Sequence, residues 1–102
     1  MYIIVTSLYP NGKIKEAIDI YAKMMTKYPD DASLGTPIVQ VAVRATHNGI
    51  KVIHISEIKK GKFEEFYAFA SKRMHMFDSI EGYSWTVKPF MNMEEALKSV
   101  GM

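Results

Sequence analysis

A few polar side chains stand within apolar, β-rich runs, and their chemistry could serve a function. His54 lies between Ile53 and Ile55, and a partly buried histidine can take up or release a proton near neutral pH. Arg44 follows a run rich in valine, and a guanidinium can hold a carboxylate through two hydrogen bonds. We therefore predict a catalytic acid or base at His54 and a ligand contact at Arg44.

Alternation along the strands predicts which other side chains join these two. Successive side chains of a strand point to opposite faces of the sheet. If the isoleucines beside His54 face the helices, then His54 and Ser56 point the other way. By the same rule Gln40 and Arg44 lie opposite the valines between them. An apolar cleft with a few convergent polar groups is typical of a small-molecule site. The predicted ligand-binding residues are Tyr2, Thr6, Gln40, Arg44 and Ser56.

Each of these residues also has a plainer interpretation. His54 can be satisfied by a carboxylate or hydroxyl across a subunit boundary, and Arg44 can lie in solvent or pair with Glu57 or an acid of a partner. We expect His47, at a turn, and His75, on the polar side of a helix, to be exposed. The three histidines match no local metal motif, and cysteine is absent. We therefore predict no metal site and no cofactor.

Composition narrows the class of protein. The chain has 102 residues, of which 48% are hydrophobic and 24% charged, and this is typical of a single globular domain spanning residues 1–102. The absence of cysteine excludes disulfides and thiolate chemistry, and it favours a reducing compartment, so we expect a cytoplasmic protein. The net charge of only +2, with scattered lysines, predicts neither nucleic acid nor a membrane as a partner.

Hydrophobic periodicity divides the chain into strands and helices. Extended runs cover Met1–Tyr9, Thr36–Ile58 and Tyr83–Phe90, and the long run is divided by His47-Asn48-Gly49. Asn-Gly between β-branched runs predicts a hairpin with a type I′ turn, in which both residues take positive φ. The helical period appears over 14–28 and 62–80. A short helix is predicted over 93–100, with Asn92 as its N-cap.

The order strand, helix, strand, strand, helix, strand predicts an α+β fold of the ferredoxin-like βαββαβ type. Right-handed crossovers and one hairpin place the first and third strands at the centre of a four-stranded antiparallel sheet. This core covers residues 1–90, and residues 91–102 form a tail with the short C-terminal helix. The strands carry large apolar residues on both faces, whereas two helices cover only one. We therefore predict a homodimer, or a higher homo-oligomer, in which a second sheet covers the other face.

The element order, the length and the two-faced strands over Met1–Phe90 resemble the dimeric α+β barrel superfamily. This superfamily includes cofactor-independent monooxygenases and muconolactone-isomerase-like enzymes, and the resemblance implies a homodimer around a cleft, with the tail reaching toward the partner. We expect a small dimeric barrel protein that binds a small molecule between the sheets, or between sheet and helices. Two alternatives stay open: a cofactor-independent monooxygenase or isomerase-like enzyme, and a structural or oligomerisation module without a ligand. Whether the protein is an enzyme is left open by the sequence.

Overall fold

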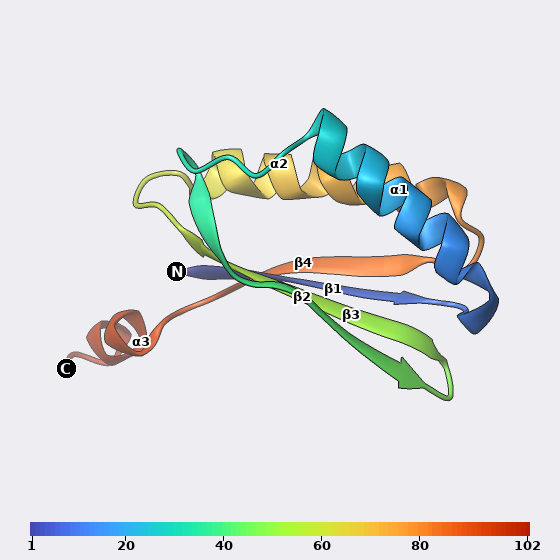
Figure 1. Cartoon of the computed structure of the whole chain (residues 1–102). Helices are drawn as coiled ribbons and strands as arrows, with labels where there is room; N and C mark the ends of the chain where they lie inside the picture. Colours follow the sequence, from blue (N-terminus) through green and yellow to red (C-terminus); the bar gives the residue numbers. More distant parts are fainter.

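Four antiparallel strands form one sheet, and two helices cover one of its faces in the computed structural model, which describes all 102 residues (Figure 1). The strand order β2-β3-β1-β4 confirms the ferredoxin-like βαββαβ prediction, with β1 and β3 central. The elements are β1 (Tyr2–Tyr9), η1 (Asn11–Lys13), α1 (Ile14–Lys27), β2 (Gly35–Thr46), β3 (Gly49–Ile58), α2 (Phe63–His75), η2 (Met76–Ser79), β4 (Ser84–Phe90) and α3 (Met93–Ser99). No helix combines the length and the apolar character that crossing a bilayer requires.

The core lies between the sheet and the two covering helices. Every second residue of β1, from Ile3 to Tyr9, is buried, because strand alternation turns these side chains toward α1 and α2. The helix predicted over 62–80 is α2 followed by the 3-10 turn η2. The buried residues that these helices and α1 contribute are Ala17, Met24, Phe66, Ala70, Arg73, Met74 and Phe77. One charged residue, Arg73, is therefore part of an otherwise apolar layer.

The β2–β3 hairpin turns through His47 and Asn48, since Thr46 pairs with Gly49. The predicted type I′ turn is wrong, because Gly49 has a φ of 128° and no residue other than glycine has a positive φ. The Thr46 hydroxyl closes the turn instead. Its Oγ1 accepts the N–H of Asn48 at 3.1 Å and donates to the carbonyl of Gly49 at 2.7 Å. These side-chain bonds hold Asn48 in an ordinary conformation.

The register between β2 and β3 shifts at two places along β2. Val39 stands opposite Ile55 and Ala42 opposite Ile53, so Gln40 and Val41 both face the single residue His54. This is a β-bulge, in which one strand carries an extra residue. Ile38 is a second extra residue, between Pro37 opposite Ser56 and Val39 opposite Ile55. Each extra residue exchanges the faces of the side chains beyond it, so the alternation along β2 is reversed at Val39 and restored beyond the bulge.

The sheet face opposite the helices is left uncovered by the chain itself. Ile4 and Ile55 pair on this face, and Thr6 stands between Ile53 and Thr86. In Figure 1, α3 projects from the end of β4, away from α1 and α2. The N-terminal ammonium group of Met1 forms a partly exposed ion pair with Glu95 of α3, at 2.6 Å.

The predicted N-cap of the terminal helix is confirmed as a full capping box. Asn92 Oδ1 accepts the N–H of Glu95 at 2.8 Å, and Glu95 Oε1 accepts the N–H of Asn92 at 3.0 Å. These two bonds satisfy backbone donors that the first turn would otherwise leave free. The helix is thus held at its start, whereas the apolar side chains of Met93 and of the C-cap residue Val100 are exposed.

Gly49→Ala should destabilise the fold strongly. A Cβ at this position would lie 2.2 Å from the carbonyl oxygen of Tyr9, and a positive φ is itself strained for alanine. We expect the free energy of unfolding in urea to fall by at least about 2 kcal/mol. Gly12→Ala is the matched control, since nothing lies within 4 Å of its added Cβ. Equal stability of the two variants would contradict the described turn.

Candidate functional site

A groove opens between the sheet and the helices, and we name it the sheet–helix groove. Its two adjoining parts enclose about 590 and 550 Å³, including space open to solvent, and they share Tyr21, Val41, Val52, Phe77 and Tyr83. The first part contains the polar side chains, whereas every residue lining the second part is hydrophobic. The groove therefore has one polar end and one apolar end.

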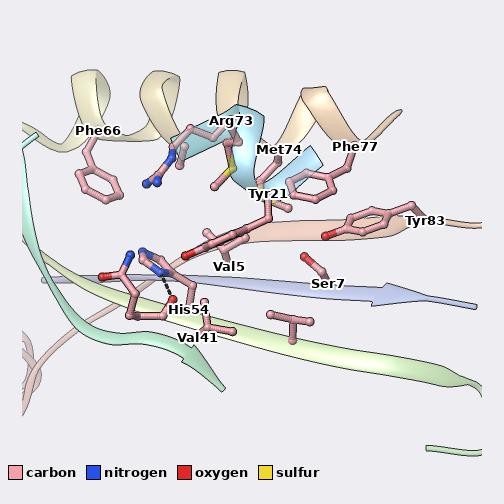
Figure 2. Close-up of a pocket in the computed structure, with 14 residues that line it drawn as sticks. Val5, Ser7, Tyr21, Val41, His54, Phe66, Arg73, Met74, Phe77 and Tyr83 are labelled. Carbon is pink, nitrogen blue, oxygen red and sulfur yellow. Dashed lines mark hydrogen bonds between the residues drawn. The ribbon is translucent and has the colours of Figure 1, made fainter. Parts of the chain in front are cut away.

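Arg73 is the main feature of the polar end. Its side chain is only 8% exposed, and in Figure 2 it reaches from α2 toward the sheet and His54. Nη1 donates to Asp30 Oδ1 at 3.2 Å, and Nη2 contacts the sulfur of Met25 at 2.6 Å. The buried Nε has no hydrogen-bond partner. The guanidinium is thus held by one carboxylate bond and one weak acceptor, which leaves its donors incompletely satisfied.

Arg73 also contacts an aromatic ring. The guanidinium carbon lies 5.0 Å from the centre of the Phe69 ring, close enough for a cation–π interaction. Sequence reasoning missed Arg73 and Asp30 as site residues. The available signal was spacing, because Phe66, Ala70 and Arg73 recur at intervals of four and three residues and so share one helix face. An arginine on an apolar helix face is the pattern to look for.

His54 is bonded at both ring nitrogens. Nδ1 lies 2.7 Å from the carbonyl oxygen of Gln40, and Nε2 lies 2.8 Å from Ser56 Oγ. A carbonyl can only accept, so Nδ1 carries the hydrogen, and Nε2 then accepts the hydroxyl hydrogen of Ser56. Burial lowers the pKa of His54, and the charge of Arg73 lowers it further, against the opposing effects of Gln40 and Asp30. The imidazole is therefore neutral at pH 7.

The contact between Ser56 and His54 has the distance of a nucleophile and its base. Ser56 is only 1% exposed, however, and it is not among the residues lining the groove. A nucleophile must reach its substrate, and this hydroxyl cannot. The arrangement therefore orients the His54 ring at the bulge and offers no free acid or base to the groove.

The predicted site residues do not all share one face. His54, Ser56 and Gln40 lie on the helix side, where Gln40 Nε2 donates to Asp30 Oδ2 at 3.2 Å. The interpretation that placed them between two sheets is wrong, because β3 turns its isoleucines Ile53 and Ile55 to the uncovered face instead. The physical reason is the pairing of Ser56 and His54 with the buried side chains of β1.

The other predicted residues, Tyr2, Thr6 and Arg44, lie on the uncovered face. On β1 the alternate residues Ile3, Val5 and Ser7 are buried under the helices. Tyr2 and Thr6, which lie between them along the strand, must therefore point away from the helices. Arg44 follows Val43, which lines the groove, and therefore also points away. These three side chains do not contribute to the sheet–helix groove.

Aromatic side chains form one wall of the groove. Phe77 and Tyr83 stack with ring centres 4.7 Å apart, and Tyr83 stacks on Tyr9 at 5.5 Å. Burial raises the pKa of Tyr83, and Tyr9 adds to the effect, whereas a hydrogen bond with Ser7 opposes it. The phenol is therefore neutral at physiological pH. No group of three or more His, Asp or Glu side chains comes close enough to hold a metal ion.

Comparison with known proteins identifies the fold and no family. No protein-family model matches the sequence, and no curated protein matches it. A similar solved structure is that of a formyltetrahydrofolate deformylase from Pseudomonas putida KT2440, with a TM-score of 0.50 and 5% sequence identity. The match covers 87% of this chain and 28% of that chain. At this identity the similarity shows a shared ferredoxin-like α+β fold only.

His54 should make the stability depend on pH near neutrality. Its pKa in the folded chain is below the ordinary value of 6.5, so the unfolded chain binds the proton more readily. Stability should therefore be complete above about pH 6.5 and decrease as the pH falls through the folded pKa. Urea unfolding between pH 7.5 and 5 measures this slope.

His54→Gln should reduce that slope, and His47→Gln, at the exposed turn, is the matched control. The pKa values of Asp31, Asp78 and Glu95 are lowered by their hydrogen bonds, but these carboxyl groups act below about pH 4.5. An unchanged slope in His54→Gln would contradict the buried neutral imidazole.

Proposed function

We propose that this ferredoxin-like domain binds a small molecule in the sheet–helix groove. The observation that carries the proposal is the buried Arg73, whose Nε lacks a partner at the polar end of an otherwise apolar groove. A buried charge is retained in proteins where it is paired or where it serves a site. A ligand with one polar group and an apolar body fits both ends.

Binding without turnover is the function that we favour over catalysis. The one histidine at the groove, His54, is neutral and engaged at both nitrogens by Gln40 and Ser56. A general base needs a free lone pair within reach of the proton that it removes. The monooxygenase or isomerase-like alternative would therefore require His54 to give up its bond with Ser56 first.

A thermal-shift screen of small aromatic and medium-chain acids, alcohols and amides tests the binding proposal. A ligand at about 100 times its Kd stabilises the folded state by about 2.7 kcal/mol. For a domain of this size the melting temperature should rise by roughly 10 to 20 °C. Native mass spectrometry should then report one ligand per chain.

Val41→Phe locates the ligand in the groove. Val41 lines both parts of the groove and is 42% exposed, so the larger side chain can be accommodated while it narrows the space. We expect the affinity for any hit to fall by at least about tenfold. Ala68→Phe, on an exposed position of α2, is the matched control. Equal loss in both variants, or in neither, would contradict the groove as the site.

Homodimer formation through the uncovered sheet face is a second proposal. Ile4, Ile53 and Ile55 lie on that face, without a covering element from their own chain. At α3, Met93 is 74% exposed and the C-cap residue Val100 is 70% exposed. An apolar sheet face without a covering element is typical of an interaction surface, and a twofold axis would cover both sheets at once.

Light scattering at micromolar concentration tests the dimer. We expect a mass of about twice 11.6 kDa. Ile4→Glu should give a monomer or an unfolded chain, because it places an unpaired charge in the buried interface between the two sheets. Ala22→Glu, on an exposed position of α1, should leave the mass unchanged. A folded wild-type monomer at this concentration would contradict the proposal.

A further inference from the structure

We propose that the ligand of the sheet–helix groove is a monocarboxylic acid with an apolar body, and that its carboxylate exchanges with Asp30 on the guanidinium of Arg73. The inference rests on the proposed binding function and names the chemical class of the ligand. It starts from the incomplete set of partners around Arg73. Nε is buried without an acceptor, and Nη2 faces only the thioether of Met25.

Asp30 is a weak partner for this cation. It offers a single oxygen to Nη1 at 3.2 Å, and its own side chain is 36% exposed. Two parallel bonds between a guanidinium and a carboxylate are stronger than one. When a ligand carboxylate takes the guanidinium, Asp30 can turn into water, so the exchange leaves neither charge buried and unpaired.

The number of charges at the groove favours a monoanion. Arg73 is the only charged residue among those lining the groove, since His54 is neutral. A phosphate dianion would leave one negative charge without compensation in an apolar site, which is unfavourable. The single negative charge of one carboxylate balances the single positive charge of the Arg73 guanidinium.

The remaining polar groups and the apolar end complete the description of the ligand. Tyr21 reaches the polar end with its hydroxyl directed toward His54 (Figure 2), and Gln40 lies beside Asp30. Beyond them the groove is lined by aromatic and aliphatic side chains such as Phe77, Tyr83 and Ile18. A flat aromatic or medium-length aliphatic body would replace water there.

Calorimetric titration with matched acids and alcohols tests the carboxylate. The probes are octanoate against octanol and 3-phenylpropionate against 3-phenylpropanol, and octyl phosphate serves as the dianion. In the wild type we expect at least one of the acids to bind about tenfold or more tightly than its alcohol and than octyl phosphate. Equal binding of acid and alcohol, or tighter binding of the phosphate, would overturn the carboxylate. Absence of binding by both acids would overturn it as well.

Two variants should change the affinity for the acid in opposite directions. Asp30→Asn removes the competing charge, so the acid should bind about five- to tenfold more tightly while the alcohol is unchanged. Arg73→Met should abolish the preference for the acid and keep the binding of the alcohol. If Arg73→Met does not fold, the Asp30→Asn result alone decides, because a purely structural Arg73–Asp30 pair predicts no gain in affinity.

The same titrations separate this inference from the proposed function. Acid and alcohol that bind equally and are both weakened by Val41→Phe would leave the groove as the site and overturn only the carboxylate. Binding that Val41→Phe leaves unchanged would place the ligand outside the groove and overturn both.

Discussion

The β-bulge of β2 opposite His54 is the local constraint on which the groove depends. Because Gln40 and Val41 both stand against one residue of β3, both side chains reach the helix side. The bulge also presents the Gln40 carbonyl to the His54 ring, which it holds together with Ser56. An acceptor at Nδ1 selects one neutral tautomer. Burial lowers the pKa of His54, although the bond to the Gln40 carbonyl opposes this shift. The bulge thus fixes the orientation of the ring, and burial keeps the ring neutral.

Arg73 is difficult to explain by stability alone. Removing a charge from water costs several kcal/mol, a large share of the roughly 5–15 kcal/mol that a domain of this kind has available. Asp30 and Phe69 offset a part of that cost, but the unpartnered Nε offsets none. An apolar residue of similar volume would stabilise such a place as well or better. The proposed ligand would complete these hydrogen bonds, and the missing stabilisation would then appear on binding.

The two faces of the sheet have different characters, and we assign them different roles. The helix side encloses the groove with its one charged residue. The uncovered side combines Ile4, Ile53 and Ile55 with polar residues such as Thr6. The similarity to the deformylase from Pseudomonas putida bears on the strand order alone, since one fold supports many unrelated sites. Function must be argued from the groove itself.

Local patterns in the sequence determined the elements, their order and the Asn92 cap, because these depend on residues close along the chain. The central position of β1 and β3 was also predictable, since crossover handedness leaves few topologies. The faces of the β3 side chains and of Gln40 were decided only by tertiary structure. A bulge depends on pairing with another strand, and one extra residue exchanges the two faces beyond it. The meeting of Arg73 with Asp30 joins residues 43 positions apart, a distance at which periodicity carries no information. The polar end of the groove exists because packing, and not local pattern, brings α2, the Asp30 loop and the bulge together.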